Sequence, residues 1–164
     1  MDLVEFNAAP DEELTHVLRA CCDVPQWAAA VRGGRPYPDV ADLLAVADQA
    51  SRALTDADVN HALAAHPRIG ERAQGNGKEA TWSRREQQGV ERSDRTATEL
   101  LDGNRAYEDR FGRVFLICAS GKSGDQILAA LRARLDNDEE TEAAVVADEL
   151  RQIALLRLRD VVDP

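Results

Sequence analysis

The sequence predicts an all-α protein, folded as a single compact domain of about eight helices. Leucine, alanine and charged residues alternate at helical spacing almost throughout the chain. Hydrophobic residues make up 44% of the sequence but aromatic residues only 4%, so the core must be built mainly from Ala, Leu and Val side chains. A chain of 164 residues suits one domain with one core. We therefore expect one domain over residues 1–164.

Helix start and stop signals divide the first part of the chain into four helices. Pro10, followed by three acidic residues, is typical of a helix N-terminus, because proline fits the first turn and acids favour the positive end of the dipole. A glycine pair beginning at Gly33 ends the next helix, and Asp39 begins the third after a stiff proline-containing connector. Thr55 is the expected N-cap of the fourth. The predicted helices are about 10–22, 24–31, 39–54 and 56–65.

The second part of the chain carries equally clear signals. Ser93 is the expected cap of a helix that stops at Gly112. Ser123 and Gln126 form a capping box for another helix, and Asn137 or Asp138 opens the last. Two glycines make residues 74–78 an expected mobile loop. The predicted helices are about 81–88, 93–111, one that begins at 123, and 137–162.

Charge and targeting signals exclude several classes of protein. The net charge of −10 argues against nucleic acid and anionic membranes as partners, because both need a basic surface. No apolar run is long enough to span a bilayer, and the N-terminus lacks a secretory signal. Cys21, Cys22 and Cys118 have no metal or redox spacing, so we expect reduced thiols. We therefore expect a cytoplasmic protein that is a monomer or a homodimer.

A histidine followed by proline is the most informative local feature. Proline disfavours α geometry in the residue before it, so His66 is expected at the end of a helix. Val59, Leu63 and His66 fall on one helical face, which directs the imidazole along the apolar stripe. Histidine suits proton transfer near neutral pH. The alternative is a structural cap that donates to the carbonyls of the last helical turn.

Two further polar residues lie where the helical pattern favours apolar ones. Glu86 shares a face with Trp82 and Gly89, which predicts a partly desolvated carboxylate. Arg157 falls in the middle of the apolar stripe of the last helix, where a guanidinium remains charged and needs an anionic partner. Either residue could instead belong to a structural ion pair. If they converge with His66, the three supply an acid or base, an orienting carboxylate and a fixed cation.

A continuous apolar run, residues 114–119, interrupts the helical pattern. It is either a buried connector or an extended segment whose backbone N–H groups bind a carbonyl or carboxylate. The loop 121–124 resembles an anion-binding loop only weakly, since it lacks the glycine spacing of a phosphate loop. His61 and His66 lie five residues apart, which does not suit two metal ligands on one helix face. We expect no metal site.

Five segments of the chain, in this order and spacing, resemble the family of 2-oxo-4-hydroxy-4-carboxy-5-ureidoimidazoline (OHCU) decarboxylases of urate degradation. The resemblance covers nearly the whole chain. Ser120 departs from members that carry arginine at that position. The segments are His66-Pro67-Arg68-Ile69-Gly70, residues 83–89, residues 104–112, Val114-Phe115-Leu116-Ile117-Cys118-Ala119, and residues 153–158.

The resemblance implies a compact all-α fold, no cofactor, and decarboxylation of a small anionic substrate, OHCU, to (S)-allantoin and CO₂. It implies His66, Glu86 and Arg157 as catalytic residues. The implied substrate-binding residues are Pro67, Ser83, Arg84, Arg85, Glu86, Gln87, Phe115, Leu116, Ile117, Cys118 and Ala119. Two alternatives stay open at this point: a helical interaction module without catalysis, and the same fold acting on another ureido or imidazoline acid.

Overall fold

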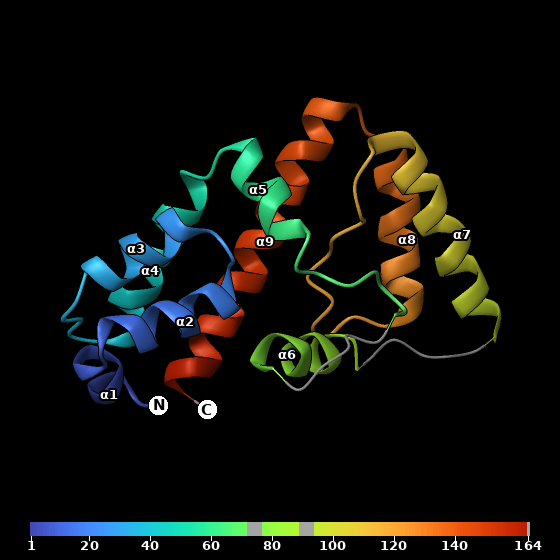
Figure 1. The fold of residues 1–164 in the computed structure, drawn as a ribbon. Helices are drawn as coiled ribbons and strands as arrows, with labels where there is room; N and C mark the ends of the chain where they lie inside the picture. The colour runs from blue at the N-terminus through green and yellow to red at the C-terminus, as the bar shows by residue number, and fades with distance from the viewer. Residues whose placement is uncertain (72–76, 89–93, 164) are drawn as a thin grey trace. The chain divides into compact units, whose positions relative to one another are not determined.

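The computed structural model describes residues 1–71, 77–88 and 94–163, and within these ranges every regular element is an α-helix. The all-α prediction is confirmed, with nine helices in the described residues where about eight were expected (Figure 1). The helices are α1 (Leu3–Ala8), α2 (Asp11–Cys21), α3 (Pro25–Gly33), α4 (Val40–Arg52), α5 (Asp56–Leu63), α6 (Lys78–Glu86), α7 (Asp94–Phe111), α8 (Gly124–Leu135) and α9 (Glu139–Val162).

Helix α1 was not predicted, although the sequence contains its signal. The Asp2 side chain accepts from the Glu5 backbone N–H at 2.8 Å, and Glu5 accepts from the Asp2 N–H at 2.9 Å. This is a capping box with Asp in place of Ser or Thr. The equivalent box at Ser123 and Gln126 was predicted and is present.

The helix before His66 is shorter than expected. Thr55 caps α5 as predicted, accepting from the Asp58 N–H at 3.2 Å, but the helix ends at Leu63 rather than at residue 65. A turn follows, in which the His66 N–H donates to the Leu63 carbonyl at 3.0 Å. His66, the residue whose backbone Pro67 restricts, therefore lies outside α5, after the turn that follows the helix.

The remaining boundaries lie close to the predictions. Helix α6 begins at Lys78, three residues before the expected start. Helix α7 ends at Phe111, and Gly112 follows with φ +67°, a left-handed conformation that favours glycine. Asp138 caps α9 by accepting from the Thr141 N–H at 2.7 Å. The proposed cap Ser93 and most of the predicted loop 74–78 lie outside the described residues.

The chain divides into two compact units, each with its own buried residues. The first comprises Met1–Ala62 and the chain from Leu150 onward, and the second comprises Leu63–Glu149. Helix α9 contributes its first part to the second unit and its remainder to the first. A single domain over residues 1–164 stays a prediction.

In the first unit, α3 packs against both α2 and α4 (Figure 1). Trp27, on α3, is buried. The indole Nε1–H donates to the Ala47 carbonyl at 3.1 Å and to the Ser51 hydroxyl at 2.9 Å, so its polar end is satisfied. Arg35, in the predicted connector, donates to the carbonyl of Ala9 at 2.8 Å and pairs with Asp11. These bonds tie the connector to the end of α1.

In the second unit, α7 and α8 pack against each other and against the apolar run 114–119. The run has no regular secondary structure, and Phe115 to Ala119 are all buried. The core also contains Tyr107, whose ring meets that of Phe115 edge-on at 5.2 Å between centroids. The interpretation of this run as a buried connector is therefore correct for its side chains.

A buried ion pair between Arg134 and Glu142 contacts the run 114–119. Arg134 donates to the Leu116 carbonyl at 2.6 Å, and its Nε donates to Glu142 at 2.8 Å. Glu142 is 0% exposed and also accepts from Tyr107 and Asn137. Burial alone would raise the pKa of Glu142, but these hydrogen bonds together outweigh it and hold the pKa below its usual range.

Candidate functional site

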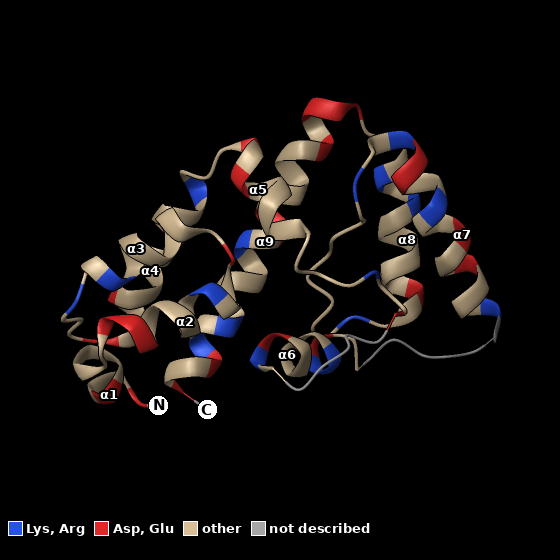
Figure 2. Ribbon diagram, in the orientation of Figure 1, with Lys and Arg blue, Asp and Glu red and all other residues tan. Residues whose placement is uncertain are grey.

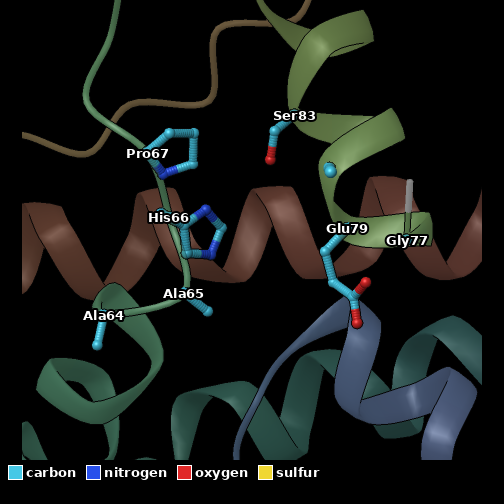
Figure 3. A pocket seen from close by; sticks show the side chains of 8 residues that line it. Ala64, Ala65, His66, Pro67, Gly77, Glu79 and Ser83 are labelled. Atoms are coloured by element: carbon cyan, nitrogen blue, oxygen red, sulfur yellow. The ribbon is translucent and has the colours of Figure 1, made fainter. Parts of the chain in front are cut away.

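His66 lines a pocket of about 330 Å³ in the second unit (Figure 3). One side comes from the turn after α5, and the other from α6 and the residue before it. The imidazole of His66 and the hydroxyl of Ser83 extend into the space between these two segments. The lining residues are Ala64, Ala65, His66, Pro67, Gly77, Glu79, Ala80 and Ser83.

The segment that carries His66 is tied to α7 on one side. Arg68 donates from Nη2 to Glu108 Oε2 at 3.0 Å, and its Nε contacts the other carboxylate oxygen, so the pair is bidentate. Asn104 is 3% exposed and donates from Nδ2 to the Ile69 carbonyl at 3.0 Å. These contacts fix the backbone two and three residues beyond the imidazole.

Gln87 ties the same segment to the end of α6. Its Oε1 accepts from the Gly70 N–H at 3.0 Å, and Gly70 has φ +90°, a conformation that suits glycine. Because the side-chain oxygen of Gln87 is engaged, its amide nitrogen remains the end that can donate to a ligand. The resemblance implies a substrate contact for Gln87, which its amide nitrogen can make as a donor without breaking the bond to Gly70.

Helix α6 presents the other predicted residues in two groups. Ser83 is 5% exposed and faces the pocket, whereas Arg84 and Arg85 are exposed. Glu86 is half-buried, as its position on the row of Trp82 predicted. The structure brings Ser83 together with His66 and Pro67, but the lining of this pocket includes none of the other predicted residues, which are Arg84, Arg85, Glu86, Gln87 and the run from Phe115 to Ala119.

The backbone N–H and carbonyl of Cys118 both form hydrogen bonds with side chains of the second unit. The Cys118 N–H donates to Glu149 Oε2 at 2.6 Å, and Lys122 Nζ donates to the Cys118 carbonyl at 2.8 Å. The expectation that this N–H holds a substrate oxygen must therefore include displacement of the Glu149 carboxylate. Sequence reasoning missed Glu149, although it lies seven residues after Glu142 and so on the same side of α9.

The charges around the Cys118 thiol place Glu86 near the same segment. Burial raises the pKa of the thiol, and the negative charges of Glu149 and Glu86 raise it further, against the effect of Lys122. The carboxylate of Glu86 is thus within electrostatic range of the apolar run. A thiol held neutral in this way is a structural group rather than a nucleophile.

Arg157 is buried in the apolar stripe of α9, as predicted, and is 4% exposed. Its Nη1 donates to the Ala20 carbonyl at 3.4 Å, within the first unit. Burial raises the pKa of the neighbouring Cys22 thiol to about 12, and the positive charge of Arg157 partly opposes that rise. Arg157 and the His66 pocket belong to different units, so their convergence stays a prediction.

Two features are absent from residues 1–71, 77–88 and 94–163. No three His, Cys, Asp or Glu side chains there are grouped so that they could hold a metal ion. No helix there is long and apolar enough to cross a membrane.

Comparison with known proteins supports the resemblance seen in the sequence. The family model described as OHCU decarboxylase matches residues 7–159. A 2-oxo-4-hydroxy-4-carboxy-5-ureidoimidazoline decarboxylase of Amia calva is 31% identical over 175 residues, which cover 99% of this chain and 95% of that protein. The protein of that name from Haloferax volcanii is 28% identical over 162 residues, which cover 98% of this chain and 95% of that protein.

Solved structures share the fold. A crystal structure of OHCU decarboxylase in the presence of (S)-allantoin matches with a TM-score of 0.73 and 24% identity, covering 95% of this chain and 100% of that one. A crystal structure of (S)-allantoin synthase matches with a TM-score of 0.74 and 19% identity, covering 99% of this chain and 55% of that one. At these identities the match concerns the fold alone.

Proposed function

Since the chain belongs to the OHCU decarboxylase family, we propose that it converts OHCU to (S)-allantoin and CO₂ in urate degradation. The observation that carries this proposal is the family match over residues 7–159, on a chain whose His66 lines a pocket with Ser83. The family match argues against a non-catalytic interaction module. A different ureido or imidazoline acid as substrate is the alternative that the assay below addresses.

The chemistry of the proposed substrate predicts a reaction that needs no electron-accepting cofactor. OHCU carries its carboxylate on a ring carbon next to a C=N bond, and loss of CO₂ pushes the bonding electrons into that imine. The substrate is therefore its own electron sink. The protein must hold the carboxylate so that the breaking bond is perpendicular to the ring, stabilise the developing negative charge, and deliver a proton to one face.

The proposed roles follow from the family resemblance and from the chemistry of each group. His66 interacts with the hydroxyl and carboxylate region of the substrate and handles the proton. Glu86 accepts hydrogen bonds from ring or ureido N–H groups. Backbone N–H groups near Ile117 and Cys118 hold a carbonyl oxygen. Arg157 fixes the anionic or carbonyl end of the substrate.

A coupled assay tests the function directly. Urate oxidase and hydroxyisourate hydrolase generate OHCU, this protein is added, and circular dichroism follows the chirality of the allantoin. We expect rapid formation of the (S) enantiomer, unchanged after dialysis against EDTA because no step uses a metal. Unaltered spontaneous decay to racemic allantoin would refute the assignment, and turnover of a related acid but not of OHCU would indicate the alternative substrate.

Two further properties complete the proposal. We infer that the enzyme acts in the cytoplasm, because its three cysteines are buried free thiols, as expected in a reducing compartment. We also infer that it is a monomer or a homodimer. Light scattering coupled to size-exclusion chromatography distinguishes these two states from larger assemblies.

A further inference from the structure

The His66 pocket contains a carboxylate to which neither the sequence nor the family resemblance assigned a role. Glu79 lies on α6 one turn before Ser83, and its half-buried side chain lines the pocket (Figure 3). In the part of the chain that the structure describes, this carboxylate takes part in no hydrogen bond or ion pair. A pocket-lining carboxylate without an internal partner has acceptor capacity available to a ligand.

The position of the carboxylate depends on the glycine before the helix. Glu79 Oε2 lies 2.8 Å from the point that a Cβ on Gly77 would occupy. Gly77 itself has φ −68° and needs no special backbone freedom. The absence of a side chain at position 77 therefore allows the carboxylate to lie against the backbone at this wall of the pocket.

The charge of Glu79 determines which part of a ligand it can accept. A carboxylate repels the carboxyl group of an anionic substrate but accepts hydrogen bonds from neighbouring N–H donors, and those bonds are charge-assisted. A ureido group presents such donors and has no charge. The pocket thus combines the hydrogen-bond-accepting carboxylate of Glu79 with the imidazole of His66 and the hydroxyl of Ser83.

We propose that Glu79 is a specificity-determining residue that binds the N–H groups of the ureido arm of the ligand. This inference rests on the proposed function, since it takes the ligand to be a ureido-substituted ring. It also orients the ligand: the ureido arm lies toward Glu79, and the carboxyl group lies away from it.

Paired ligands provide the test. (S)-allantoin carries a ureido arm, and hydantoin is the same ring without one. Binding of each to the wild-type protein and to Glu79→Gln is measured by calorimetry, and the folding of each variant is checked by thermal melting. We expect the substitution to weaken (S)-allantoin binding about 10-fold and to leave hydantoin binding within about twofold.

A second variant separates position from charge. In Gly77→Ala the new Cβ displaces the Glu79 carboxylate while its charge remains. We expect the same selective loss of (S)-allantoin binding, of smaller size. Glu13→Gln is the matched control, because Glu13 also lies in the first turn of its helix, α2, but is exposed and outside the pocket. This control should not change the binding of either ligand.

The outcomes distinguish this inference from the proposed function. Equal weakening of both ligands, unchanged binding in Glu79→Gln, or no (S)-allantoin binding by the wild-type protein would overturn the role of Glu79. Failure to decarboxylate OHCU, with selective ureido binding retained, would overturn the proposed function alone.

Discussion

At the scale of single residues, the position of His66 depends on contacts that are remote from its imidazole. Arg68, Ile69 and Gly70 are each tied to α6 or α7 by a side chain. Such anchoring keeps the segment that carries a proton-transferring group in place. The imidazole remains directed to the pocket, where the family resemblance implies that the proton is handled.

Substitution of His66 tests this role. His66→Asn should fold normally but lose at least about 10²-fold in turnover of OHCU, because general acid–base catalysis contributes on that order. Freshly generated OHCU is the substrate, and a thermal melt checks the fold. The matched control is His61→Asn, since His61 is exposed and outside the pocket. Wild-type turnover by His66→Asn would exclude His66 as the proton-handling residue.

At the scale of elements, α9 carries two carboxylates, two turns apart, that support the run 114–119. Glu142 acts through Arg134 on the Leu116 carbonyl, and Glu149 accepts directly from the Cys118 N–H. A segment without regular secondary structure has few backbone hydrogen bonds of its own, so side chains must supply them. The run is therefore held by the helices around it rather than by pairing with another strand.

Loss of the Glu142 carboxylate should destabilise the fold. Glu142→Gln leaves the Arg134 guanidinium buried without a neutralising charge, and breaking a buried pair from one side costs about 3 kcal/mol. Urea unfolding measures the difference in the free energy of unfolding. Glu140→Gln is the control, because Glu140 is an exposed neighbour on the same helix, and it should remain within about 0.5 kcal/mol of wild type. Equal stability of the two variants would contradict this account.

The elements were mostly predictable from the sequence, because caps and glycines act locally. Asp39, Thr55, Ser123 and Gly112 each mark a boundary through a contact within a few residues. The buried role of Glu142 was not predictable, since it follows a run of acids that is typical of an exposed helix start (Figure 2). Its burial depends on Arg134 and Tyr107, which only the folded chain brings to it.

Only part of the candidate site could be predicted from the sequence. His66, Glu86 and Arg157 interrupt apolar patterns, so the sequence alone singles them out. Glu79 interrupts no pattern, because it lies in a polar helix turn, and only the pocket reveals it. The sequence likewise predicts a surface position for Glu149, and only the structure shows that its carboxylate accepts from the Cys118 N–H.

At the scale of the whole molecule, the chain is strongly acidic, and its stability should depend on pH through its carboxylates. The pKa values of Asp48, Asp58, Glu108, Asp138 and Glu142 all lie below the ordinary values of 3.8 for Asp and 4.5 for Glu. For four of them the main cause is a hydrogen bond donated to the ionised carboxylate: by an Arg side chain to Asp48 and Glu108, by the Thr55 hydroxyl to Asp58, and by the Thr141 N–H to Asp138. Folding thus favours the charged form of these groups.

The direction of the pH dependence follows from these shifts. The carboxyl groups bind protons more weakly in the folded chain than in the unfolded one, so their contribution is fully present above about pH 4.5 and is lost as the pH falls through the folded pKa values. Urea unfolding between pH 7 and pH 3 should therefore show a free energy of unfolding that falls on the acid side. A constant free energy across that range would contradict the prediction.

The Cys118 peptide has a consequence for isotope exchange. Its N–H lies outside any helix, where amide protons ordinarily exchange with solvent deuterium quickly, yet it is buried and donates to the Glu149 carboxylate. It should therefore exchange as slowly as amides inside helices. A ligand that replaces Glu149 as acceptor would leave this proton slow, whereas one that only displaces the carboxylate would make it fast. A single amide signal can thus report how the run 114–119 receives its ligand.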